Sequence, residues 1–155
     1  AWERTIDDGL YAFNDLHAIM AFLGAGRMRD AERMLDSLRR SAHGEGDNAR
    51  MSREVGLPAA EAFVAFSAGR HAEAAEKLTS VRGVAQRFGG SHAQRDVLAL
   101  TALHAAMKAG MKSTAEALSS ERVMMKPHSP WAARLSRQAR NVGAGQPSRQ
   151  TAAAK

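Results

Sequence analysis

Three segments of the chain share a pattern in which an alanine follows a glycine by five residues. The glycines are Gly26, Gly69 and Gly110, spaced 43 and 41 residues apart, and the alanines are Ala31, Ala74 and Ala115. Glycine adopts positive φ without strain, so it suits a tight turn between two helices. A small alanine lets the two helices of such a hairpin cross closely. Because one hairpin cannot bury its apolar face alone, the pattern predicts a stack of helical hairpins.

The composition agrees with this expectation. The 155 residues suffice for one domain with a core, and Ala, Leu, Met, Arg and Glu, which favour helices, dominate. The absence of cysteine excludes disulfides and thiol-based metal sites, and no apolar run reaches the ~20 residues that span a bilayer. We expect an all-α, cytoplasmic protein without a cofactor. Because it begins without methionine, we expect it to be the carboxyl portion of a longer protein.

Apolar residues at helical spacing predict the domain organisation. We expect a repeat domain over residues 1–142, with hairpins at about 14–40, 58–88 and 91–122 and a terminal helix at 129–142. Asn14 is the expected N-cap of the first helix. We expect a loop over 41–48, a short helix over 49–55 and a new helix beginning around Pro58. Residues 143–155 lack large apolar side chains and predict a disordered basic tail.

Two glycines end a helix at Gly90, and Ser91 with Gln94 then forms a predicted capping box for the next helix. Around these positions we expect the stack to depend on the turn glycines, the small alanines and the end of the last hairpin. The expected structural residues are Gly26, Ala31, Gly69, Ala74, Gly90, Ser91, Gln94, Gly110, Ala115, Pro127 and Trp131.

Charge is distributed unevenly along the chain. All 16 acidic residues lie at or before Glu121, whereas seven of the 22 basic residues follow it, so the first 121 residues carry a net charge of −1. The basicity is therefore a property of the carboxyl end, and we do not expect a nucleic-acid-binding protein. Arg134, Arg137 and Arg140 form a basic stripe, either a solvated face or a surface for an acidic partner, a membrane or RNA.

The hairpin pattern resembles the tetratricopeptide repeat, whose unit is ~34 residues, although the units here are longer. Plain helical hairpins that converge on this spacing are the alternative. The runs NDLHA at 14–18, GGSHAQRD at 89–96 and SPW at 129–131 resemble the tetratricopeptide repeat protein 38 family over roughly residues 2–135. That resemblance implies an α-helical repeat fold and no established catalytic activity. The family usually has a second aromatic after the Pro-Trp pair, where this chain has Ala132 and Ala133.

Polar residues suggest one candidate pocket. His92 and Asp96 are four residues apart and share a helix face, and His17 and Arg95 could join them. These four side chains could hold a small ligand or a peptide terminus. His17, His92 and Asp96, together with Asp15, could instead act as metal ligands or simply satisfy helix ends and loop carbonyls. The chain has no HExxH motif, no P-loop and no dinucleotide fingerprint. We therefore expect no metal and no catalytic residue. His43, His71 and His128 are expected to be solvated.

Apolar residues on the leading helices suggest a second kind of site. Met20, Phe63, Phe66 and Met107 would line the concave side of a right-handed solenoid of about seven helices, with His104 in the core or at the groove edge. Methionine and aromatic side chains suit a surface that accepts an amphipathic helix. We expect a non-catalytic protein-interaction module that binds a peptide or helix; the alternative is a small-ligand or enzymatic pocket. The candidate binding residues are Asn14, His17, Met20, Phe63, His92, Arg95, Asp96 and His104.

Overall fold

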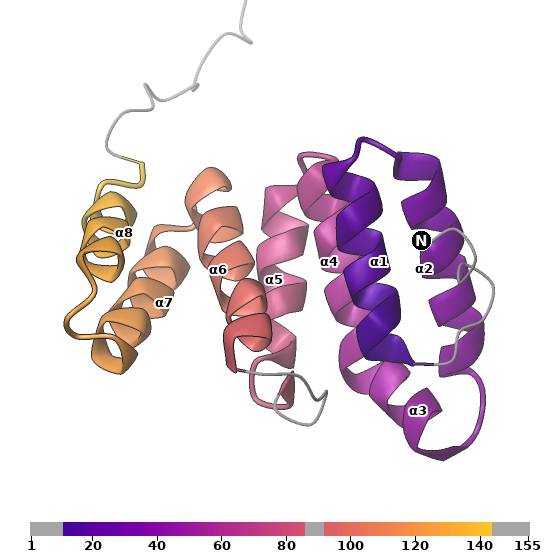
Figure 1. The fold of residues 1–155 in the computed structure, drawn as a ribbon. Helices are drawn as coiled ribbons and strands as arrows, with labels where there is room; N and C mark the ends of the chain where they lie inside the picture. The colour runs from indigo at the N-terminus through magenta and orange to yellow at the C-terminus, as the bar shows by residue number, and fades with distance from the viewer. Residues whose placement is uncertain (1–10, 86–91, 144–155) are drawn as a thin grey trace, which may run out of the picture.

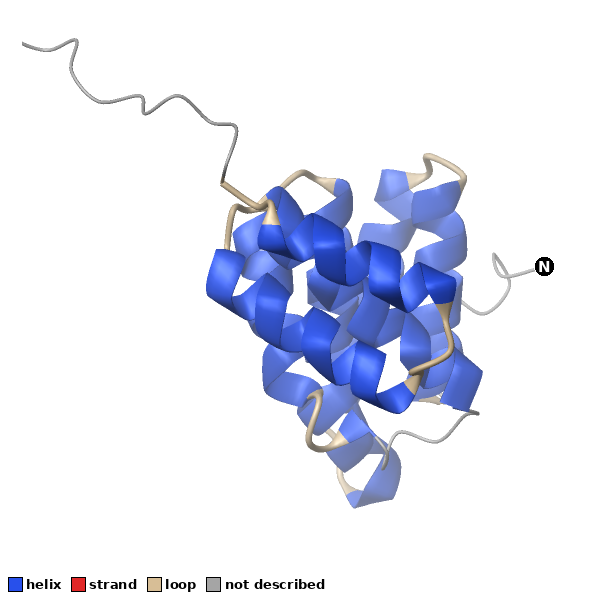
Figure 2. Ribbon diagram, turned by 90° about the vertical axis from the view of Figure 1, so that its left-hand side faces the viewer, coloured by secondary structure: helices blue, strands red, loops and turns tan. Residues whose placement is uncertain are grey.

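The computed structural model describes residues 11–85 and 92–143, and every regular element within them is helical (Figure 2). The prediction of an all-α protein is therefore confirmed for this part of the chain. The elements are α1 (Ala12–Gly24), α2 (Met28–Ala42), α3 (Gly46–Met51), the π-helical turn η2 (Ser52–Gly56), α4 (Leu57–Ser67), α5 (His71–Val81), α6 (His92–Lys108), α7 (Lys112–Met125) and α8 (Pro130–Arg140). None of these described helices is long and apolar enough to cross a membrane.

The helices form a row in which chain neighbours pack side by side (Figure 1). Helices α1 and α2 pack on each other, and both contact α4. From α4 onward, each helix packs on the next, through α5, α6 and α7 to α8. As a result, α1 and α2 lie at one end of the row and α8 lies at the other (Figure 1).

Three turns with the same geometry join α1 to α2, α4 to α5 and α6 to α7. Gly26, Gly69 and Gly110 have φ of 71°, 80° and 74°, as the glycine spacing predicts. In each turn, the N–H of the residue after glycine donates to the carbonyl five residues earlier, over 2.8, 2.8 and 2.9 Å. This is the bond of a Schellman helix end. The alanines at the three crossings, Ala31, Ala74 and Ala115, are each 0% exposed.

The predicted N-cap of the first helix was wrong by three residues. Tyr11, not Asn14, is the N-cap of α1, and Asn14 is an exposed residue in the first turn. The N–H of Ala12 donates instead to Oδ1 of Asn48, over 3.2 Å. Asn48 can reach it because α3 begins at Gly46, inside the stretch that we expected to be a loop. A long-range contact therefore replaces the local cap.

The chain from Gly46 to Ser67 is one continuous helix, not a short helix followed by a new start at Pro58. Proline lacks an N–H and its ring clashes with the carbonyl four residues back. The wider π-helical turn η2 directly precedes this point and accommodates the proline without ending the helix. If residues 46–67 are counted as one helix, the described residues contain seven helices, the number expected.

Other boundaries also differ from the expected ones. Helix α5 ends at Val81 and is followed by a turn over residues 82–84, whereas the prediction extended the second hairpin to residue 88; residues 86–88 lie outside the described part of the chain. Helix α8 begins at Pro130, where Oγ of Ser129 accepts the N–H of Ala132 over 3.2 Å. The capping box of Ser91 and Gln94, the turn at Gly90 and the carboxyl tail lie outside the residues or side chains that the structure describes.

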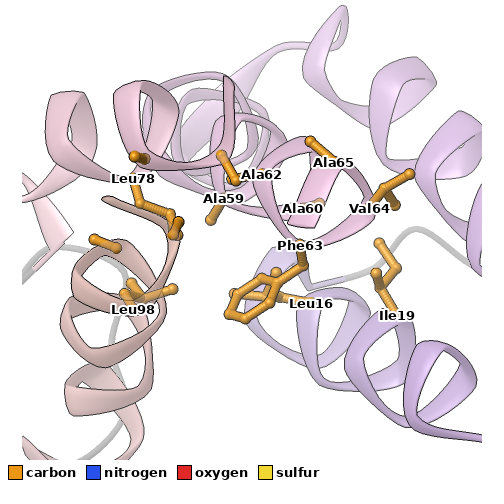
Figure 3. Packing of buried hydrophobic residues seen from close by; sticks show 14 of the residues in the cluster. Leu16, Ile19, Ala59, Ala60, Ala62, Phe63, Val64, Ala65, Leu78 and Leu98 are labelled. Atoms are coloured by element: carbon orange, nitrogen blue, oxygen red, sulfur yellow. The ribbon is translucent and has the colours of Figure 1, made fainter. Parts of the chain in front are cut away.

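The core is centred on α4. Figure 3 shows Phe63 beside Leu16 of α1 and Val64 beside Ile19, also of α1. Four alanines of α4, Ala59, Ala60, Ala62 and Ala65, are fully buried, and these small side chains allow its neighbours to approach closely. The same cluster includes Leu78 of α5 and Leu98 of α6 (Figure 3). One continuous core therefore joins the hairpins.

Candidate functional site

A groove of about 490 Å³ lies where the ends of α1 and α4 meet α5 and α6. Its described lining residues are Met20, Leu23, Gly24, Phe63, Phe66, Ser67, His71, Thr101 and Lys108. Pockets of this size, largely apolar with a few polar groups, are typical of binding sites. The groove thus brings together residues from all three glycine-linked hairpins.

The apolar wall of the groove comes from the last turns of α1 and α4. Met20 and Phe66 are half-buried, whereas Phe63 is buried and forms the floor. The structure therefore brings Met20 and Phe63 together in one depression, and Phe66 joins them. Met107 is half-buried against the core instead. No carboxylate contributes to the lining among the described residues.

The polar edge consists of His71, Thr101 and Lys108. His71 was expected to be solvated, but it is half-buried because its ring packs on Phe66, with 5.1 Å between the ring centroids. Its Nδ1 is buried and has no hydrogen-bond partner among the described residues. Lys108 is exposed and makes no ion pair within the same part of the chain. Sequence reasoning missed both as groove residues because neither lies on an apolar stripe.

His104 shares a face of α6 with Thr101 and Lys108, from which it is three and four residues away. It is half-buried. Burial lowers its pKa, and the positive charges of Lys108 and Arg122 lower it further. The imidazole is therefore neutral at pH 7 and can both donate and accept a hydrogen bond.

His17, Arg95 and Asp96, three of the four residues of the predicted polar pocket, lie in different surroundings. Nδ1 of His17 lies 2.8 Å from the carbonyl oxygen of Phe13, whose ring also packs on the imidazole at 4.3 Å between centroids. Arg95 lines a different hollow, about 270 Å³ in volume, with residues of α5 and Met125. The side chain of His92 lies outside the described residues. No interaction among the described side chains joins His17 to Asp96.

Asp96 is clamped by two cations, Arg122 of α7 and Lys126, which directly follows that helix. Its carboxylate accepts two bonds from the Arg122 guanidinium, at 2.7 and 3.0 Å, and one from Nζ of Lys126 at 2.8 Å. The bonds from Arg122, assisted by Lys126, outweigh partial burial and lower the pKa of Asp96 to about 2. Asp96 is thus ionised and used in joining α6 to α7.

Arg122 extends this connection to α8. Arg122 is only 4% exposed, and its guanidinium carbon lies 4.9 Å from the centroid of the Trp131 ring, which is a cation–π contact. Sequence reasoning did not single out Arg122. The available signal was its position on the buried stripe of α7, with Ala115, Leu118 and Ser119, where a charged residue requires a partner.

Within the described residues, no group of three or more His, Asp or Glu side chains could hold a metal ion. No family model matches the chain, and no solved structure matches it.

Proposed function

We propose that this chain is a non-catalytic protein-interaction module of the tetratricopeptide type, a right-handed solenoid that binds an amphipathic helix or peptide in the groove. Membership of the tetratricopeptide repeat protein 38 family and a cytoplasmic location are parts of the same proposal. The observation that carries it is the groove itself, in which Met20 and Phe66 stay half-buried above a Phe63 floor.

Three features support a repeat architecture. The glycine turns have matching φ and the same backbone bond, and the second helix of each hairpin packs on the first helix of the next. The first helices, α1, α4 and α6, all contribute to the groove. In a stack of hairpins, one face is lined by the first helices and forms the surface on which extended or helical partners lie.

The shape and chemistry of the groove favour an apolar partner face. Methionine side chains adapt to different partners, and phenylalanine provides large contact area. An amphipathic helix presents apolar side chains at i, i+3, i+4 and i+7, which suits a groove walled by the apolar last turns of α1 and α4. Thr101 and the exposed Lys108 add hydrogen-bonding groups at its edge.

A displayed library of helical peptides with apolar residues at those positions tests the proposal. We expect wild-type protein to select peptides that Met20→Glu binds at least tenfold more weakly, because a carboxylate would be desolvated against the apolar wall. Ala21→Glu is the matched control, since Ala21 is the adjacent, exposed residue of α1. Failure to select any peptide, or equal binding by both variants, would contradict the proposal.

A further inference from the structure

Helix α8 presents a face that the groove does not use. Ala132, Leu135, Ser136 and Ala139 are buried, and α8 packs on α7. On the other side, Trp131, Arg134, Arg137 and Arg140 are exposed and follow one another at three-residue steps. The row therefore rises about 13 Å along the helix axis while it winds about half a turn around the solvent-facing side of α8. Helix α8 lies at the end of the molecule opposite α1 and α2 (Figure 1).

The positive charges of the three arginines in this row are not neutralised by carboxylates of the described residues. The chain has no carboxylate side chain after Glu121, whereas residues 122–143 contain five basic side chains. Asp96, the acidic residue that reaches α7 from α6, is already occupied by Arg122 and Lys126. No carboxylate among the described residues pairs with Arg134, Arg137 or Arg140. A polyanion is therefore the complementary partner.

Trp131 stands at the start of this row and is held in place. The guanidinium of Arg122 lies over its ring at 4.9 Å, and two hydrogen bonds to Asp96 fix that guanidinium. The residue is nevertheless 39% exposed. A preorganised, partly exposed indole beside arginines provides a surface on which a nucleobase can stack.

We propose that this face of α8 binds single-stranded nucleic acid, with Arg134, Arg137 and Arg140 contacting phosphates and Trp131 stacking on a base. A guanidinium donates two parallel hydrogen bonds to a phosphate, which distinguishes it from a simple positive charge. Insertion into a membrane is less compatible with the structure, because the apolar side of α8 is already packed on α7. The inference concerns a surface separate from the groove, so either can fail without the other.

Fluorescence titration with labelled 12-nucleotide oligo-dT and oligo-U tests the proposal on the full chain. A Trp2→Phe background leaves Trp131 as the one indole, since the chain has two tryptophans. We expect quenching of Trp131 on binding. The logarithm of affinity should fall with the logarithm of salt concentration with a slope of about −2, as three phosphate contacts on a single strand imply.

The triple variant R134Q/R137Q/R140Q should bind at least tenfold more weakly and lose most of the salt dependence. The matched control R29Q/R40Q/R50Q removes the same charge from exposed positions of α2 and α3 and should bind within twofold of wild type. Trp131→Ala should weaken binding about tenfold, and Trp131→Phe should restore most of it. Far-ultraviolet circular dichroism checks that each variant keeps its helicity.

The proposal is overturned if the triple variant binds oligonucleotide as wild type does, or if the control loses as much affinity. It is also overturned if the chain binds phosphatidylserine vesicles or polyglutamate but neither oligonucleotide. Binding to duplex DNA that is as tight as binding to the single strands would remove the role given to Trp131.

Discussion

The two halves of the molecule each contain a carboxylate clamped by two cations, and the two clamps differ in burial. In the first half, Glu61 of α4 accepts from Arg39 of α2 at 3.2 Å and from Lys77 of α5 at 2.7 Å. In the second half, Asp96 accepts from Arg122 and Lys126. The Arg39 side chain is 47% exposed, whereas that of Arg122 is 5% exposed.

This difference shows that an ion pair's effect depends on its surroundings. When an exposed ion pair forms, its two groups exchange contacts with water for contacts with each other, and the net gain in stability is small. A buried guanidinium is not solvated by water. If its carboxylate partner is removed, a desolvated charge remains, and if the arginine itself is truncated, a cavity and an unpaired carboxylate remain. The first half, with the alanine-rich α4 at its centre, therefore depends on apolar packing, and the α6–α7–α8 end also depends on a directional electrostatic contact.

Truncation of the two arginines should give the largest contrast. We expect Arg122→Ala to lower the free energy of unfolding by about 3 kcal/mol, because Asp96 loses its bidentate partner and Trp131 loses its support. Arg39→Ala, the matched change in the exposed clamp, should cost less than about 1 kcal/mol. Urea unfolding measures both. Equal costs would show that burial does not distinguish the two clamps.

Enlarging a crossing alanine should have an intermediate effect that is common to both halves. Ala74→Leu and Ala115→Leu should each cost about 2 kcal/mol, because both alanines are fully buried where two helices meet and the added atoms force them apart. Ala72→Leu, at an exposed position of α5, is the control. Thermal unfolding provides the measurement. A cost confined to one half would show that the two glycine-linked crossings are not equivalent.

Acid should weaken the contact of Asp96 with Arg122 and Lys126, with a smaller effect on stability than the substitutions above. The pKa of Asp96 is about 2 in the folded protein against an ordinary value of 3.8, so the unfolded chain binds more protons between these values. The contribution of Asp96 to stability is therefore complete above about pH 5 and is lost as pH falls through 4 towards 2. We expect a loss of about 1 kcal/mol, reduced by the partial exposure of the side chain.

The stability difference between wild type and Asp96→Asn, followed from pH 6 to pH 2.5, isolates this contribution from other carboxylates. Hydrogen exchange should locate the acid-sensitive opening in α7 and α8 and leave α1 and α2 protected. A difference that does not change with pH would mean that the ionisation of Asp96 does not stabilise the fold.

Much of the helix pattern could be predicted from the sequence because it depends on local chemistry. Gly26, Gly69 and Gly110 identified three turns because each needs positive φ, and apolar periodicity located α2, α4 and α7. Predictions failed where a distant residue replaces a local signal. Asn14 resembles a cap, but the α1 end is satisfied by Asn48, 36 residues away from Ala12.

For the candidate binding groove and the polar residues, too, local sequence signals led to correct predictions and long-range contacts did not. Met20 and Phe63 could be proposed because apolar periodicity identifies the faces of helices, and the structure places both in the groove. His71 and Lys108 could not, since a groove edge forms only when α5 and α6 come together. Asp96 was selected as a polar residue near a helix start, but its partners, Arg122 and Lys126, are 26 and 30 residues away.

The sequence by itself determined where the chain turns and which face of each helix is apolar, because φ preference and hydrophobic periodicity act over a few residues. Only the tertiary structure decided which charges neutralise one another and which remain exposed. Pairing of Asp96 with Arg122 requires α6 and α7 to lie side by side, and the same packing leaves Arg134, Arg137 and Arg140 facing solvent. Electrostatic interaction depends on distance in space, which local sequence does not encode.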